Sequence, residues 1–214
     1  MKTDIITIKS DLGGHDLVME TAEKFAVYHG ISERDARHLR LLTEETVSMV
    51  HGILDAFEGK FWMESEKTKD SIICRICLSA EKQVTQEQET QILSVSTSGK
   101  NENARGVMGK IRELLRRSLQ MPSEADEQYL QTVSDAWLTT GSNGFSAADS
   151  NYWSLQLYRN NLSPEQESRK EEWDELEKSI IAKLADEVKV WLNNNSTTVV
   201  IEKNFPVSSG GNIR

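Results

Sequence analysis

The feature that most constrains the fold is a series of strand-like segments joined by short polar turns. Three of them follow one another as "KFWMESEK", "SIICRICLSAEK" and "TQILSVSTS", the last two with alternating apolar residues. Near the end of the sequence, "EVKVWL", "NNNS" and "TTVVIEKNF" have the pattern of a strand, a polar turn and a strand. These segments predict a sheet whose strands are largely antiparallel.

A helix is expected before the first of these strands. The segment "DIITI", residues 4–8, predicts a short strand, and the helix follows over residues 16–29. Gly30 is placed to end this helix. The residues that share one stripe of the helix are Leu17, Thr21, Phe25 and Tyr28.

A second helix is predicted from Glu33 to about Phe57, with Ser32 as its N-cap and Gly59 as its end. At 100° per residue its core-facing stripe is Leu39, Leu42, Thr46, Val50, Ile53 and Phe57.

Two adjacent carboxylates on this second helix are not equivalent. Glu44 falls nearly opposite the apolar stripe and should be solvated, whereas Glu45 falls on the edge of the stripe, with Met49 one turn further on. A carboxylate at such an edge can act as a general base or orient a water molecule. A solvated boundary residue is the more ordinary interpretation of the same spacing.

The later part of the chain adds further elements. The segment "NENARGVMGKIRELLRRSLQM" is helical and ends at Pro122, residues 123–133 predict a second helical piece, and "YWSLQLY" predicts a strand. Another helix begins at Ser163. Its amphipathic pattern comes from Trp173, Leu176, Ile180 and Leu184.

This order of elements predicts an α/β two-layer sandwich, with helices on one face of a mixed, largely antiparallel sheet. The length of 214 residues suits one domain with an insertion. We assign the domain to residues 1–205, and we expect residues 206–214 to be a disordered tail.

Composition excludes several classes of protein. The net charge of −9 argues against nucleic acid as the main partner. No apolar run approaches the roughly 20 residues that cross a membrane. With only two cysteines, Cys74 and Cys77, the chain has no disulfide framework, and a reducing cytoplasm is the expected location.

The segment "FAVYHGISERDARHLRLLTEETVSMVHGIL" resembles the start of the GHKL (Bergerat-fold) ATPase domain, in the form seen in bacterial anti-sigma-factor serine kinases. That group has a helix, a turn ended by glycine, an acidic helix start and a signature of the type E-x-x-x-N. The segment "LEKSIIAKLADEVKVWLNNNSTTVVIEKNF" is similar to the end of the same domain, where "DEV", a strand, a polar turn and "TTV" follow a helix. With the central strands, the resemblance covers roughly two thirds of the chain.

The resemblance implies a role for each matching position. Glu45 matches the glutamate that acts as base or orients water, and Met49 stands where the magnesium-binding asparagine is expected. A thioether is a poor ligand for this hard cation. In "TSGKN", Thr97 replaces the aspartate that binds adenine, Gly99 is kept, and Asn101 replaces the second glycine of D-x-G-x-G.

The glycine-rich segment that would wrap the phosphates is also missing, because "SRKEEWDELEK" contains no glycine. The resemblance thus implies ATP with Mg²⁺ as cofactors, and the motif losses argue against both.

The interval from about 101 to 169 replaces the family's ATP lid and is far longer than a simple lid. It contains a local basic cluster, for which an acidic or phosphate-bearing partner and a solvated helix face are the two interpretations. The cluster consists of Lys110, Arg112, Arg116 and Arg117.

Cys74 and Cys77 form a C-x-x-C motif, which is typical of redox or zinc sites. Because residues three apart on a strand point to opposite faces, two buried packing cysteines are the better interpretation. A cap or surface position is likewise the better interpretation of each histidine, and the histidines are His15, His29, His38 and His51.

Three hypotheses follow. The leading one is a cytoplasmic GHKL-fold regulator that binds a protein such as a sigma factor or an anti-sigma antagonist, has a degenerate nucleotide site and forms a possible homodimer. The second is an active ATP-dependent serine/threonine kinase or ATPase. The third is a structural or interaction domain that shares only the fold.

Overall fold

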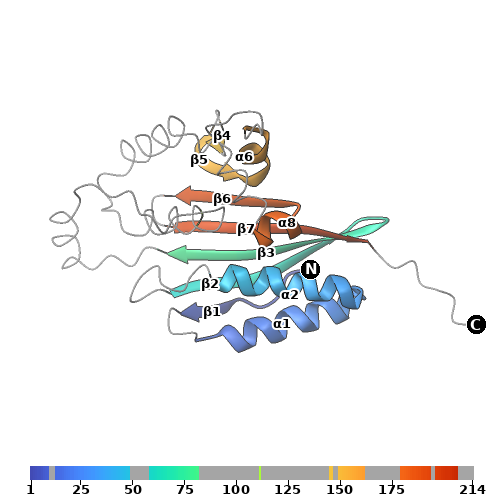
Figure 1. Ribbon diagram of the computed structural model, residues 1–214. Coiled ribbons are helices and arrows are strands. Elements are labelled where there is room, and N and C mark those ends of the chain that lie inside the picture. The colour runs from blue at the N-terminus through green and yellow to red at the C-terminus, as the bar shows by residue number, and fades with distance from the viewer. Residues whose placement is uncertain are drawn as a thin grey trace, which may run out of the picture.

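A computed structural model of the chain describes residues 1–9, 13–48, 58–81, 111, 145–146, 149–161, 179–193 and 196–206. It is a mixed α/β structure built on one open antiparallel sheet (Figure 1). Its described elements are β1 (Ile6–Lys9), α1 (His15–His29), α2 (Glu33–Ser48), β2 (Glu58–Lys67), β3 (Ser71–Glu81), β4 (Phe145–Ser146), β5 (Asp149–Ser154), α6 (Leu155–Asn161), α8 (Ile180–Leu184), β6 (Glu187–Asn193) and β7 (Ser196–Pro206).

The sheet has seven described strands in the order β1-β2-β3-β7-β6-β5-β4, and each pairing between them is antiparallel. The last strand in the sequence, β7, therefore lies in the middle of the sheet, between β3 and β6. The prediction of a largely antiparallel sheet is confirmed, as are the first two of the three successive strands and the strand, turn and strand near the end of the sequence. The predicted strand "TQILSVSTS" lies outside the described residues.

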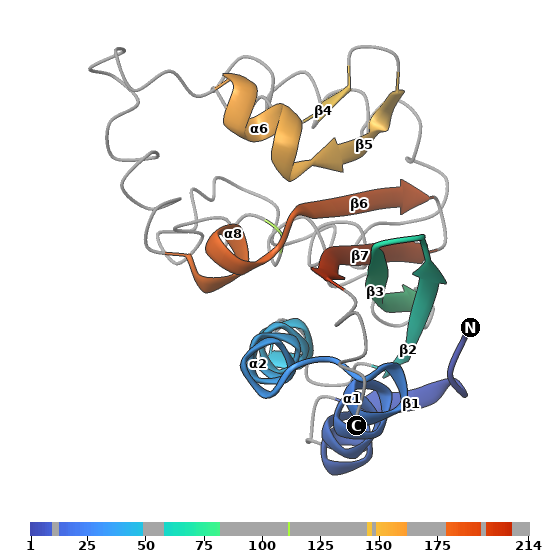
Figure 2. The same cartoon turned by 90° about the vertical axis from the view of Figure 1, so that its right-hand side faces the viewer.

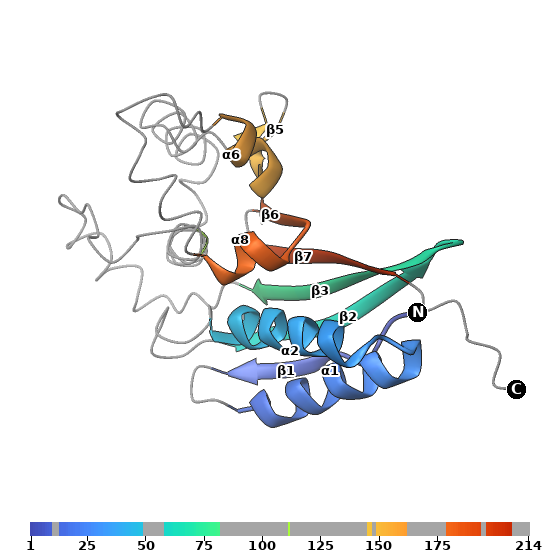
Figure 3. The same ribbon diagram turned by 45° about the vertical axis from the view of Figure 1, so that its right-hand side comes forward.

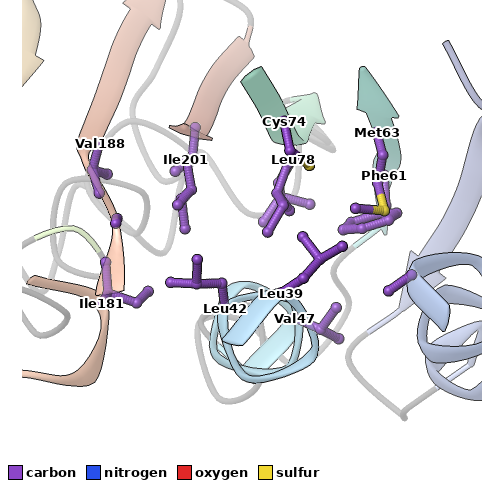
Figure 4. Packing of buried hydrophobic residues seen from close by; sticks show 14 of the residues in the cluster. Leu39, Leu42, Val47, Phe61, Met63, Cys74, Leu78, Ile181, Val188 and Ile201 are labelled. Atoms are coloured by element: carbon purple, nitrogen blue, oxygen red, sulfur yellow. The ribbon is translucent and has the colours of Figure 1, made fainter. Parts of the chain in front are cut away.

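The described helices α1, α2 and α8 lie on one side of the sheet (Figure 2), and α1 and α2 run side by side (Figures 1 and 3), with α1 against β1 and α2 against β3 and β7. Alternate residues of the strands point into the core between these layers, because side chains alternate across a strand. In one row across the sheet, Phe61, Leu78 and Val199 are register neighbours, and each is 0% exposed. Figure 4 shows Leu39 and Leu42 of α2 pointing into this core.

The start of α1 is shifted by one residue from the prediction, and so is its buried stripe. Leu17 is 52% and Tyr28 is 72% exposed, so the predicted stripe was wrong apart from Phe25. The buried residues of α1 are Val18, Met19, Ala22, Phe25 and Ala26. The predicted end is confirmed, because Gly30 adopts a left-handed φ of 63° and its N–H donates to the Val27 carbonyl.

The N-terminus of α2 also follows the prediction. The Asp35 N–H donates to Ser32 Oγ at 3.2 Å, and the Ser32 hydroxyl donates to the Asp35 carboxylate at 2.8 Å. The helix is described as far as Ser48, and residues 49–57 lie outside the described residues. Gly59 was wrongly predicted to end the helix. It lies within β2, paired with Ile8 of β1 and Ala80 of β3.

The predicted strand "YWSLQLY" is half strand and half helix. The chain leaves β5 at Ser154, whose hydroxyl accepts from the Leu157 N–H at 3.3 Å and so caps α6. The Gln156 N–H donates to a carboxylate oxygen of Glu187, which β6 brings to the same helix start. A distant strand therefore supplies part of the signal that starts α6.

The helix predicted from Ser163 is described only in α8, and residues 162–178 lie outside the described residues. Ser179 caps α8 by accepting from the Ala182 N–H at 3.2 Å. Ile180, predicted on the apolar face, is 43% exposed, and the next residue, Ile181, is buried instead. Pro206, the last residue of β7, pairs with Ser71 of β3. The predicted tail, which starts at residue 206, therefore begins at least one residue too early.

Candidate functional site

Helix α2 places Glu44 and Glu45 as its periodicity predicts. Glu44 is exposed, whereas Glu45 is half-buried at the edge of the core stripe. The Ser48 hydroxyl donates to the Glu45 carbonyl oxygen at 3.0 Å and so supports the last described turn. A half-buried carboxylate at this edge can accept a proton or a hydrogen bond from a group in a neighbouring pocket.

The other predicted site positions, Met49, Thr97, Gly99 and Asn101, lie outside the described residues. Within the described ranges, the structure therefore assembles no second group of the predicted nucleotide site around Glu45. The roles of these four positions stay predictions.

Two threonines of α2 are buried on its core-facing side. Thr43 and Thr46 are both 0% exposed, and their hydroxyls donate to the carbonyls of Leu39 and Leu42, at 2.8 Å and 2.6 Å. These local bonds satisfy the hydroxyls, so small polar side chains can lie in the core. The helical stripe predicted Thr46 at a core position but missed Thr43.

The cysteines have the packing role that the strand pattern predicts. Cys74 and Cys77 both lie on β3, both are buried, and neither forms a disulfide. Cys74 belongs to the core beneath the helices, and Cys77 lies in the register row of Trp62 and Val200 on the other face of the sheet. Burial raises the pKa of the Cys77 thiol to about 12, which suppresses the reactive thiolate.

The open face of the sheet carries a charge ladder that the sequence analysis missed. Glu64, Arg75 and Glu202 are register neighbours on β2, β3 and β7. Arg75 Nε lies 3.6 Å from a Glu202 oxygen, and the same oxygen accepts from Lys189 Nζ at 2.7 Å. Lys2 Nζ lies 3.4 Å from Glu64, which also accepts from the indole of Trp62.

We interpret this charge ladder as a structural feature of the sheet and not as a catalytic or binding site. The side chains of Arg75, Glu202 and Lys189 are 29%, 22% and 28% exposed, and each charge faces an opposite one. Partly exposed ion pairs of this kind contribute little individually, and one face of an antiparallel sheet is commonly solvated. Each strand shows the alternating polar residues in its sequence, but the pairing of one strand with the next requires the register.

The histidines are less uniform than predicted. His15 lies 3.7 Å from Asp16 and His38 lies 3.8 Å from Asp35, both near helix starts. His29, in the last turn of α1, is different, because its Nε2 atom is buried and no group in the described part of the chain forms a hydrogen bond with it. His51 lies outside the described residues.

The interval 101–169 is described only at residue 111, residues 145–146 and residues 149–161. Ile111 is 0% exposed and belongs to the core. Strands β4 and β5 extend the sheet beyond β6, so the described part of this interval is not purely helical. The basic cluster of Lys110, Arg112, Arg116 and Arg117 lies outside the described residues.

Among the residues that the structure describes, no three His, Cys, Asp or Glu side chains gather as metal ligands would. None of the described helices is long and apolar enough to span a membrane. No protein-family model, curated protein or solved structure matches the chain.

Proposed function

We propose that the chain is a regulatory protein with a GHKL-like two-layer sandwich, similar to anti-sigma-factor kinases, which acts mainly through protein binding and has a degenerate nucleotide site. In this proposal the interval 101–169 stands in place of the ATP lid. The protein is cytoplasmic, and its partner is a protein such as a sigma factor or an anti-sigma antagonist.

The observation that carries the proposal is the contact between the two segments with the family's sequence pattern. One segment, which begins at Phe25, forms the end of α1, the Gly30 turn and α2, and the other forms α8, β6 and β7. Although well over 100 residues separate them, α2 packs against α8 and β7 on the same side of the sheet. Figure 4 shows Leu42 of α2 pointing toward Ile181 of α8.

The degenerate site follows from the sequence positions around this frame. Glu45 keeps the carboxylate and is half-buried, whereas Met49 and Thr97 cannot supply the metal-binding amide and the adenine-binding carboxylate. Loss of both contacts removes most of the selective binding of Mg-ATP, but it leaves the outer surfaces of the fold available for protein binding.

Isothermal titration calorimetry with Mg-ATP tests this proposal on the full chain. We expect no saturable heat at micromolar ligand. Micromolar binding that Glu45→Ala abolishes and Glu44→Ala preserves would refute it, because the two variants remove the same charge from adjacent positions and only Glu45 is half-buried at the edge of the core stripe.

The half-buried position of Glu45 favours one second candidate, an active serine/threonine kinase or ATPase. It requires phosphate transfer to a protein, or slow ATP hydrolysis, that depends on Glu45 and not on Glu44.

Light scattering of the purified chain separately tests the homodimer that belongs to the leading hypothesis.

A further inference from the structure

The imidazole of His29 lies in an unusual setting at the turn between the first two helices. Its ring centroid is 4.5 Å from that of Phe25 and 4.9 Å from that of Tyr28. The residue is half-buried as a whole, but its Nε2 atom is buried and has no hydrogen-bond partner among the described residues. We call residues 27–31, which join α1 to α2, the α1–α2 corner.

An unpartnered Nε2 suits the neutral imidazole better than the protonated one. In the neutral ring Nε2 can be the unprotonated nitrogen, whereas both nitrogens of the imidazolium carry N–H groups. A buried charged donor without an acceptor is strongly disfavoured. The geometry alone therefore opposes protonation in this position.

The charged groups around the His29 ring also oppose its protonation. Burial is the largest cause that lowers the pKa of His29, followed by the amino group of Met1 and then by Lys67 at the end of β2. Both groups are cations, and no carboxylate in the described residues offsets them at this ring. The helix dipole acts in the opposite direction, because it favours a cation in the last turn of α1.

We propose that His29 is a proton-sensitive latch: the neutral ring packs on Phe25 and Tyr28 in the last turn of α1 and so stabilises the α1–α2 corner, and protonation at mildly acidic pH destabilises this turn. Rotation of the ring out of its place beside Phe25 hydrates Nε2 and the added charge. The rotation also removes the ring contact with Tyr28, a residue that is 72% exposed. The rest of the sheet and core need not change.

Nuclear magnetic resonance of the full-length chain tests the latch. Histidine and tyrosine ring resonances and amide hydrogen exchange are followed from pH 8 to pH 5, with exchange corrected for its intrinsic pH dependence. We expect Tyr28 to shift with the same midpoint as His29. The opening constant of the corner amides should rise by up to about tenfold per pH unit below the unfolded pKa, while the amides of β3 stay protected.

Two variants separate the latch from general acid sensitivity. His29→Gln removes the titrating group and should abolish the extra exchange of the corner. His38→Gln removes another imidazole from α2, beside Asp35, and should leave the response intact. The proposal is overturned if His29→Gln keeps the acid response, or if wild-type His29 titrates without any change in Tyr28 or the corner amides. The wild-type titration decides the question even if His29→Gln does not fold.

Discussion

Leu42→Ala provides the sharpest test of the packing between α2, α8 and the sheet. Leu42 is 0% exposed, and the substitution removes three carbons from its side chain. At about 0.8 kcal/mol per buried methylene, the transfer contribution alone is about 2.5 kcal/mol. The cavity left behind raises the expected loss of unfolding free energy to about 3–5 kcal/mol.

The neighbouring residue supplies the matched control. Leu41 is 40% exposed on the same helix, so Leu41→Ala makes the same chemical change with almost the same change in helix propensity. We expect it to cost about 1 kcal/mol or less. Guanidinium unfolding followed by tryptophan fluorescence measures both variants, and the thermal midpoint should fall by roughly 6–20 °C for Leu42→Ala.

Equal effects of the two substitutions would refute the reasoning. They would mean that α2 does not bury Leu42 against α8 and the sheet. The contact between the two family-like segments would then be lost as the basis for the proposed function. A loss of unfolding free energy in Leu42→Ala alone supports the orientation of α2. Whether the chain binds Mg-ATP is then decided by the calorimetry.

Three further outcomes are expected. Gly30→Ala should lower the free energy of unfolding by about 1 kcal/mol, measured by thermal or chemical unfolding, because φ is 63° and no described atom beyond the adjacent residues lies within 4 Å of the added methyl. Gly14→Ala should lower it more, because its methyl would lie 2.3 Å from the Thr7 carbonyl oxygen. Cys74 and Cys77 should not react with a thiol reagent at pH 8 until the chain is unfolded, because burial raises the pKa of both thiols; rapid labelling of the native protein would contradict the strand assignment. The indole hydrogen bond to Glu64 lowers the pKa of that carboxyl below 4.5, so its stabilising effect is present above pH 4.5 and is lost as the pH falls through the lower folded value; Glu64→Gln should remove this part of the acid dependence of unfolding.

Features with a short sequence period could be predicted well. The alternation in residues 71–81 and 196–206 predicts strands, and both are strands of the sheet. The Gly30 stop and the Ser32 cap were likewise predicted, because each acts within one helical turn. The separation of Glu44 from Glu45 depends only on the angle of each residue around α2, so it too could be predicted.

Features that depend on distant residues could not be predicted. Helix α6 begins where "YWSLQLY" looks like one strand, because Glu187 from β6 contributes to its cap. The ladder from Lys2 to Lys189 requires the register of several strands, which alternation within a single strand does not determine. The same difficulty applies to the proposed nucleotide site, whose positions are far apart in the sequence, because the sequence pattern does not determine which of them lie together in the fold.

The shifted stripe of α1 shows how a turn can decide between two helical faces. Residues 15–29 carry apolar side chains on more than one face, so periodicity alone allows either Leu17 or Val18 to face the core. The two glycines that precede α1, Gly13 and Gly14, decide between these two faces. The Lys9 N–H donates to the Gly13 carbonyl at 3.0 Å, and Gly14 approaches the Thr7 carbonyl so closely that no Cβ fits. This contact fixes where α1 starts against β1 and thereby turns Val18 inward and Leu17 outward. A side chain at position 14 should therefore disturb the orientation of the whole helix, whereas one at position 30 should strain only the corner.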